Sequence, residues 1–172
     1  MPDDTLNVVF VCTGNQFRSP LAAAVFEREA PGRSVRVSSC GISAFDGSPA
    51  FAEAVELLGG LSVDLTHHRS RGLSDLGDAD LVIGFERRHV ERAVVDADAP
   101  RERTLTLPQA VELLEASPRD GSPRGRIDAL RPGSLLEAPE VEDPIGLPKR
   151  RQEEIVDEIE GLARRLAAAL FR

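Results

Sequence analysis

Cys12 and Arg18 are the two residues whose types and spacing most directly indicate chemistry. They enclose five residues in the segment CTGNQFR. A cysteine thiolate is a nucleophile, and an arginine guanidinium presents a planar fork that matches two oxygens of a phosphate group. Because the chain contains 21 lysines and arginines, this spacing alone is a weak signal, and the surrounding sequence must decide its meaning.

The flanking sequence predicts that this segment joins a strand to a helix. Residues 6–11 form a nearly continuous apolar run rich in β-branched side chains, typical of a strand buried on both faces of a parallel sheet. Residues 19–30 place apolar side chains at helical spacing, with Ser19 as the expected N-cap and Pro20 in the first turn. In such a loop, backbone N–H groups and the helix dipole can point at one concavity, which favours a dianion.

The residues inside the loop fit this interpretation. We expect Gly14 to supply the backbone freedom that the turn needs, and Asn15 is a residue type that tolerates left-handed conformations. Helix N-termini and arginines favour a thiolate over a thiol, so Cys12 is predicted to be a nucleophile and Arg18 to hold phosphate. The remaining residues predicted to bind the phosphate are those of the loop and the start of its helix: Thr13, Gly14, Asn15, Gln16, Phe17 and Ser19.

The rest of the chain alternates between strand and helix patterns. Strands are predicted at residues 35–39, 80–85 and 104–107, and helices at 48–58, 86–95, from 107 onward, and 149–171. This alternation predicts an α/β fold: a doubly wound, four-stranded parallel sheet with helices on both faces and the phosphate loop after the first strand. A chain of 172 residues with 41% apolar side chains is expected to form one domain over residues 1–172.

Residues 117–139 break the alternation, with four prolines, three glycines and four arginines. We predict a flexible insertion that is dispensable for chemistry. Its arginines either help to select protein substrates or belong to a solvated linker.

Composition excludes several classes of partner. The net charge of −8 and the pI near 5.0 argue against nucleic acid and anionic membranes. No apolar run approaches the roughly 20 residues that span a bilayer, and the first residues lack a signal-peptide pattern, so we expect a cytoplasmic protein. Two cysteines cannot build a disulfide framework, and three histidines without further ligands at suitable spacing predict neither a metal site nor a cofactor.

The loop resembles the signature of the low-molecular-weight protein tyrosine phosphatases, Cys-x-Gly-Asn-x-x-Arg-Ser-Pro. The likeness covers most of the chain outside residues 117–139, and continues at Ser39-Cys40-Gly41, Gly47-Ser48-Pro49, residues 68–73, Ala79-Asp80-Leu81 and Asp143-Pro144. It implies hydrolysis of phosphotyrosine in a protein, or of a small aryl phosphate, without a cofactor.

The resemblance also assigns roles outside the loop. It implies that Asp143 is the general acid, since a phenolate leaving at neutral pH is helped by a proton. It implies that His68 supports Asn15, although a surface histidine beside His67 is an alternative interpretation. Phe45 is at a position where the family tends to place an aromatic wall of the cleft.

The sequence departs from the family after Pro144, where an aromatic side chain is common and Ile145 stands here. The resemblance implies that Asn15 fixes the loop, whereas the Ser19 hydroxyl is placed to donate to the sulfur. The implied mechanism is double displacement: Cys12 attacks phosphorus, Asp143 protonates the leaving oxygen, and Asp143 then activates water.

Two other functions stay open from sequence alone. Arsenate reductases share this fold and a Cys-x5-Arg loop, but they need further cysteines, and only Cys40 is available. An inactive phosphate-binding module is the other alternative, although it gives no reason for Cys12, Arg18 and Asp143 to occur together.

Overall fold

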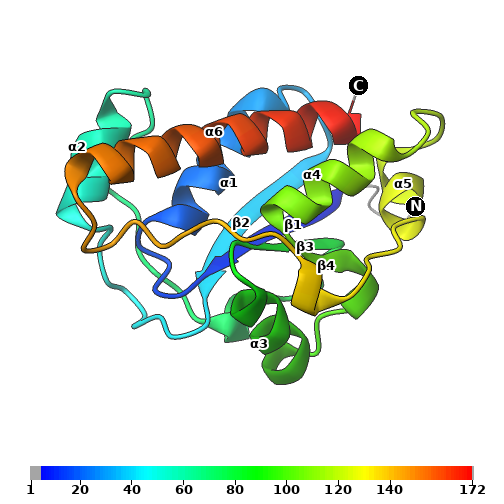
Figure 1. The fold of residues 1–172 in the computed structure, drawn as a ribbon, viewed down its shortest axis with the longest axis horizontal. Coiled ribbons are helices and arrows are strands. Elements are labelled where there is room, and N and C mark those ends of the chain that lie inside the picture. The colour runs from blue at the N-terminus through cyan, green and yellow to red at the C-terminus, as the bar shows by residue number, and fades with distance from the viewer. Residues whose placement is uncertain (1–4, 172) are drawn as a thin grey trace.

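A computed structural model describes residues 5–171 of the protein. It shows a four-stranded, fully parallel sheet with helices on both faces (Figure 1). The strand order is β2-β1-β3-β4. The predicted fold class is therefore confirmed. The strands are β1 Leu6–Cys12, β2 Val35–Gly41, β3 Leu81–Gly84 and β4 Thr104–Thr106.

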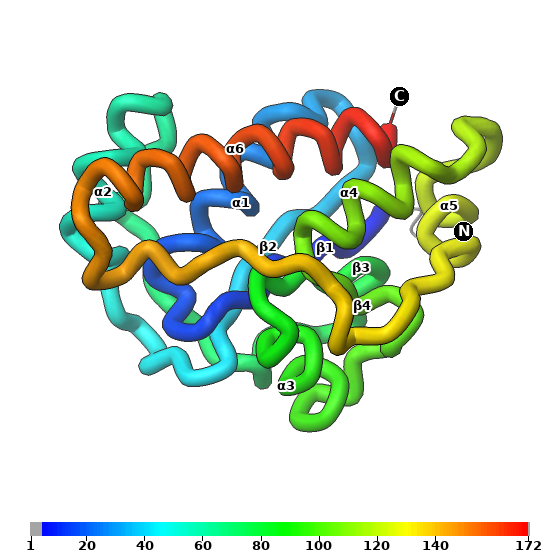
Figure 2. The backbone as a smooth tube through the Cα atoms, in the orientation of Figure 1, coloured from blue at the N-terminus to red at the C-terminus, as the bar shows by residue number. Residues whose placement is uncertain are grey.

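Helices α1, α4 and α6 cover one face of the sheet, and α3 covers the other (Figure 1). Residues 138–148 then run past the carboxyl ends of the strands before α6 returns along α1 (Figure 2), and Val141 N donates to Phe85 O at 2.7 Å. The helices are α1 Arg18–Glu29, α2 Ala52–Gly59, α3 Arg87–Ala97, α4 Leu107–Ala116, α5 Pro123–Asp128 and α6 Lys149–Phe171.

Burial on both faces explains why β1 is almost entirely apolar. Val8 and Phe10 lie in the larger core with α1 and α6, where the Phe10 and Phe26 rings meet edge to face at 5.7 Å. Val9 and Val11 lie in a second cluster under α3. When both faces of a strand are covered, neither faces solvent, so polar and apolar residues do not alternate along it.

Helix α2 begins at Ala52, four residues later than the sequence pattern predicted. Residues 48–51 instead contact other segments: Pro49 pairs with Arg69 in an antiparallel bridge, and Phe51 N donates to Gln16 O at 3.1 Å. The bond from Phe51 connects the segment to the phosphate loop.

Residues 117–139 contain a helix that the sequence pattern did not indicate, α5. Ser122 caps it by accepting from Gly125 N at 3.1 Å, and Ile127 is buried in the main core. Arg126 is also buried and donates to the carbonyls of Leu114 and Ala169. A six-residue helix is too short to display a period, whereas the Ser-Pro start signal was available. The dispensability of this segment for chemistry stays a prediction.

Within residues 5–171, no helix is both long enough and apolar enough to cross a bilayer.

Candidate active site

The phosphate loop connects the carboxyl end of β1 to α1, as predicted. Cys12 is the last residue of β1 and Arg18 is the first residue of α1. Asn15 adopts the left-handed conformation, with φ of 54°. Gly14 does not have a positive φ, so Asn15 and not this glycine supplies the left-handed position of the loop.

Gly41, at the end of β2, allows the loop to approach the sheet closely. A Cβ atom at this position would lie 2.6 Å from Thr13 O and 2.8 Å from Asn15 N. The backbone after Gly41 also bonds to the loop. Ile42 N donates to Cys12 O and Ser43 N donates to Thr13 O, both at 2.9 Å. The carbonyls of the first two loop residues are thereby engaged by the backbone that follows β2.

A chain of hydrogen bonds ends on the Cys12 sulfur. Asn15 Oδ1 accepts from Arg71 N at 2.9 Å, which fixes the amide so that Nδ2 donates to Ser19 Oγ at 2.8 Å. Ser19 Oγ lies 3.0 Å from Cys12 Sγ and 3.4 Å from Cys40 O, so the sulfur is the nearer of the two acceptors for its proton. Ser19 lies inside the first turn of α1 and caps nothing; the N-cap is Phe17, so the N-cap prediction was wrong.

His68 contacts the loop at its asparagine. Its Nε2 donates to Asn15 O at 2.6 Å, and Asn15 Nδ2 also donates to Ser39 Oγ at 2.9 Å. Burial, which disfavours the charged imidazole, lowers the pKa of His68 despite the bond to Asn15. His68 is therefore hydrogen-bonded to the loop and does not lie free on the surface; its role in supporting Asn15 stays a prediction.

Arg18 is buried and bonded on several sides. Its NH1 donates to Glu86 Oε1 at 2.6 Å and to Val141 O at 3.1 Å, and its guanidinium lies 5.8 Å from the centre of the Phe85 ring. Its NH2 lies 3.3 Å from Asp143 Oδ2. The residues preceding α6 thus bring Asp143 to the loop from the far end of the chain.

A small pocket brings the predicted chemical groups together. Asp143, whose side chain is 37% exposed, lies at this pocket with Cys12 and Arg18. Phe45 does not line it and is 84% exposed. Its full lining is Cys12, Thr13, Gly14, Gln16, Phe17, Arg18, Phe51, Asp143 and Ile145.

His89 and Glu86 are part of the site, although no sequence pattern indicated a role for them. His89 Nδ1 accepts from the backbone of Phe85 and of Glu86, both at 3.1 Å. Burial, and then the nearby charge of Arg18, lower the pKa of His89 from 6.5 to about 3, so the ring is neutral. Burial opposes ionisation of Glu86, but its hydrogen bonds to Arg88 and Arg18 outweigh this and lower its pKa.

Comparison with known proteins identifies the family. The chain matches the family described as low molecular weight phosphotyrosine protein phosphatase over residues 7–117. It belongs to this family. The resemblance seen in the loop is therefore confirmed, and a phosphatase is favoured over the alternatives of an arsenate reductase or an inactive module.

The relatives include enzymes named for two substrates. A protein-arginine-phosphatase of Geobacillus stearothermophilus is 32% identical over 165 residues, 95% of each chain. A probable low molecular weight protein-tyrosine-phosphatase of Ralstonia solanacearum, EpsP, is 36% identical over 89 residues, which span 49% of this chain and 60% of EpsP.

Solved structures of the family share the fold. A YwlE mutant of Bacillus subtilis superposes with a TM-score of 0.76 and 28% identity, over 98% of this chain and 100% of that one. The low molecular weight protein tyrosine phosphatase of T. tengcongensis has a TM-score of 0.71 and 30% identity, over 94% and 97% of the two chains.

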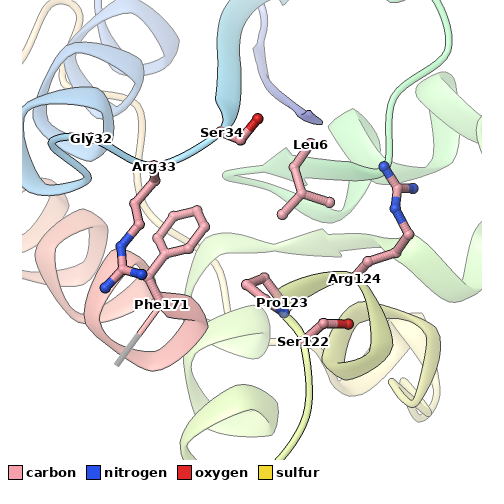
Figure 3. Close-up of a pocket in the computed structure, with 8 residues that line it drawn as sticks. All are labelled: Leu6, Gly32, Arg33, Ser34, Ser122, Pro123, Arg124 and Phe171. Atoms are coloured by element: carbon pink, nitrogen blue, oxygen red, sulfur yellow. The ribbon is translucent and has the colours of Figure 1, made fainter. Parts of the chain in front are cut away.

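A larger pocket, of about 250 Å³, lies at the other end of the sheet in this phosphatase (Figure 3). Its wall includes Leu6, at the start of β1, Ser34, which directly precedes β2, and Phe171. Its lining includes no cysteine, histidine or carboxylate, so the reactive groups mark the smaller pocket as the candidate active site. Within residues 5–171, no three His, Cys, Asp or Glu side chains are grouped so that they could hold a metal ion.

Proposed function

We propose that this chain is a protein phosphatase that hydrolyses phosphotyrosine through a phosphocysteine on Cys12. The observation that carries the proposal is the convergence of three groups on one pocket: the Cys12 thiol with its Ser19 partner, the buried Arg18, and the Asp143 carboxyl. A nucleophile, an anion-binding group and a proton donor are the parts that this reaction requires.

In the first step, the Cys12 sulfur attacks phosphorus as the bond from phosphorus to the phenolic oxygen breaks. Asp143 delivers a proton to that oxygen, so tyrosine leaves as a neutral phenol. The loop N–H groups and Arg18 hold the remaining phosphoryl oxygens.

In the second step, a water molecule attacks the phosphocysteine. Asp143, now a carboxylate, takes a proton from this water, and the bond from phosphorus to sulfur breaks. Ser19 donates to the departing thiolate, because its hydroxyl accepts from Asn15 and the sulfur, at 3.0 Å, lies nearer to it than its other acceptor, Cys40 O at 3.4 Å.

The contact between Arg18 and Asp143 couples substrate binding to acid catalysis. Arg18 NH2 lies beside the Asp143 carboxyl, while Glu86 and the Val141 carbonyl hold NH1. A phosphoryl dianion competes with Asp143 for NH2 and leaves the NH1 contacts in place. Asp143 is thereby released from Arg18 and can reach the leaving oxygen, where a general acid must act.

Phosphoarginine is a second candidate substrate, favoured by Gln16 and by the Geobacillus relative. Gln16 Nε2 donates to Pro49 O at 2.8 Å, which leaves Oε1 as an acceptor at the pocket. An amide oxygen, together with the Asp143 carboxylate, can accept from the N–H groups of a phosphorylated guanidinium. A phenyl ring offers no such donors. The walls contributed by Phe51 and Ile145 suit an aromatic ring instead.

The test is phosphate release from three peptides of one sequence that carry phosphotyrosine, phosphoarginine or phosphoserine, each with and without a chelator. We expect the highest kcat/KM for phosphotyrosine and no effect of the chelator. A higher value for phosphoarginine would establish the second candidate. Failure of the folded protein to hydrolyse any of the three would refute the proposed function.

A further inference from the structure

The side-chain hydroxyl of Thr13, in the phosphate loop, is surrounded by hydrogen-bond donors. His89 Nε2 and Arg88 NH2 each lie 3.0 Å from Thr13 Oγ1, and Arg18 NH2 lies 3.5 Å from it. A hydroxyl oxygen has two lone pairs and one proton. The two shorter contacts are sufficient to occupy both lone pairs.

Both close neighbours of this hydroxyl can only donate to it. A guanidinium has no acceptor atom, so Arg88 must be a donor. His89 Nδ1 accepts two backbone N–H bonds, and in the neutral ring the proton is therefore on Nε2, which faces Thr13. Arg88 is held in place as well, because its Nε and NH2 donate to the two oxygens of Glu86 at 3.0 and 3.1 Å.

The proton of the Thr13 hydroxyl must therefore point away from α3. Among residues 5–171, the structure shows no acceptor for it, and Thr13 lines the small pocket with Cys12 and Asp143. We propose that the Thr13 hydroxyl donates a hydrogen bond to a phosphoryl oxygen of the bound substrate, with Arg88 and His89 directing its proton. This inference rests on the proposed function.

The arrangement adds a side-chain donor to a loop that otherwise offers backbone N–H groups and Arg18. Bonds from fixed donors strengthen as negative charge develops on phosphoryl oxygens, so such a donor contributes both to binding and to rate. Arg88 also balances the negative charge of Glu86, which would otherwise weaken the attraction of the site for a dianion. Arg88 and His89 are positioning residues in this scheme, and Thr13 contacts the substrate.

The experiment measures how inorganic phosphate protects Cys12 from alkylation by iodoacetamide, followed by mass spectrometry of the Cys12 peptide. The alkylation rate without phosphate reports the reactivity of Cys12, and the phosphate dependence gives the Kd. We expect Thr13→Val to raise this Kd about 10- to 100-fold, the range for a lost hydrogen bond to a charged group. Its alkylation rate without phosphate should stay within about twofold of wild type, since iodoacetamide is neutral and needs no anion site.

Thr13→Ser retains the hydroxyl and should restore phosphate binding to within about threefold of wild type. Arg88→Gln should weaken phosphate binding severalfold, whereas Arg92→Gln, which removes a charge paired with Asp96 elsewhere on α3, should not.

An unchanged Kd for phosphate in Thr13→Val would overturn the inference. If Thr13→Ser binds phosphate as weakly as Thr13→Val, the loss of affinity comes from a distorted loop and not from the hydroxyl. An altered alkylation rate of Thr13→Val without phosphate would mean the same, and either result would overturn the inference. Failure of phosphate to protect the wild-type protein would instead contradict the proposed function.

Discussion

Replacing Asp143 separates a phosphatase from a protein that merely binds phosphate. If Asp143 is the general acid, Asp143→Ala should lower kcat on a phosphotyrosine peptide by about 10² to 10⁴. This loss corresponds to about 3–5 kcal/mol in the activation barrier. Phosphate binding should change much less, because Arg18 keeps its bonds to Glu86 and to the Val141 carbonyl after its contact with Asp143 is removed.

The assay compares kcat across aryl phosphates whose phenols differ in pKa. A stable phenolate departs without a proton, so the loss in Asp143→Ala should shrink as the phenol becomes more acidic. The dependence on leaving group should therefore be steeper in the mutant than in the wild type. Glu142→Gln is the matched control, since Glu142 is the adjacent carboxylate and is paired with Arg151 outside the pocket.

A loss of kcat by the same factor for every phenol in Asp143→Ala would contradict this role of Asp143. The absence of any loss would contradict it too. Either result would mean that another group supplies the proton, or that Asp143-Pro144 is only a turn. A loss of similar size in Glu142→Gln would point to the local charge, not to a proton transfer, as the origin of the effect.

Three further predictions concern the surroundings of the nucleophile. Glu86→Ala should lower the free energy of unfolding by about 3 kcal/mol and raise KM, because it removes a partner of the buried Arg18; chemical denaturation showing no loss would contradict this. His89, with a pKa lowered to about 3 from 6.5, contributes stability above pH 6.5 that is lost as pH falls from there toward 3, by about 1.4 kcal/mol per pH unit. Urea titrations of wild type and His89→Gln should therefore differ in pH slope below 6.5, and equal slopes would refute the assignment. Peroxide should inactivate the protein without forming a Cys12–Cys40 disulfide, because the two side chains belong to core clusters on opposite faces of the sheet; mass spectrometry detecting that disulfide would restore the arsenate reductase alternative.

The part of the site that could be predicted from sequence is local in the chain. The apolar run before Cys12 and the helical pattern after Arg18 place both residues at the carboxyl edge of a parallel strand, because strand, loop and helix are consecutive. The left-handed backbone of Asn15 was predictable too, since this residue type tolerates that conformation.

The contacts that position these groups come from distant segments, and residue patterns do not show them. Glu86 and His89 follow the third strand, and only the β1–β3 pairing brings them to the loop. Their positions after a strand were the available signal, because ligands in such folds bind beyond the carboxyl ends of strands. Phe45 shows the reverse case: an aromatic at an expected position is exposed, and Phe51 and Ile145 form the walls.

The central claim is a covalent phosphocysteine on Cys12, and the most direct measurement is its detection. A small aryl phosphate with an acidic phenol should be mixed with Asp143→Ala, in which formation of the intermediate needs no acid but its hydrolysis lacks a base. After acid quenching, mass spectrometry should find one phosphoryl group on the peptide containing Cys12 and none in Cys12→Ala, which has no nucleophile at this position. Turnover by Cys12→Ala at the wild-type rate, or a phosphoryl group on any other residue of the Asp143→Ala protein, would contradict the account.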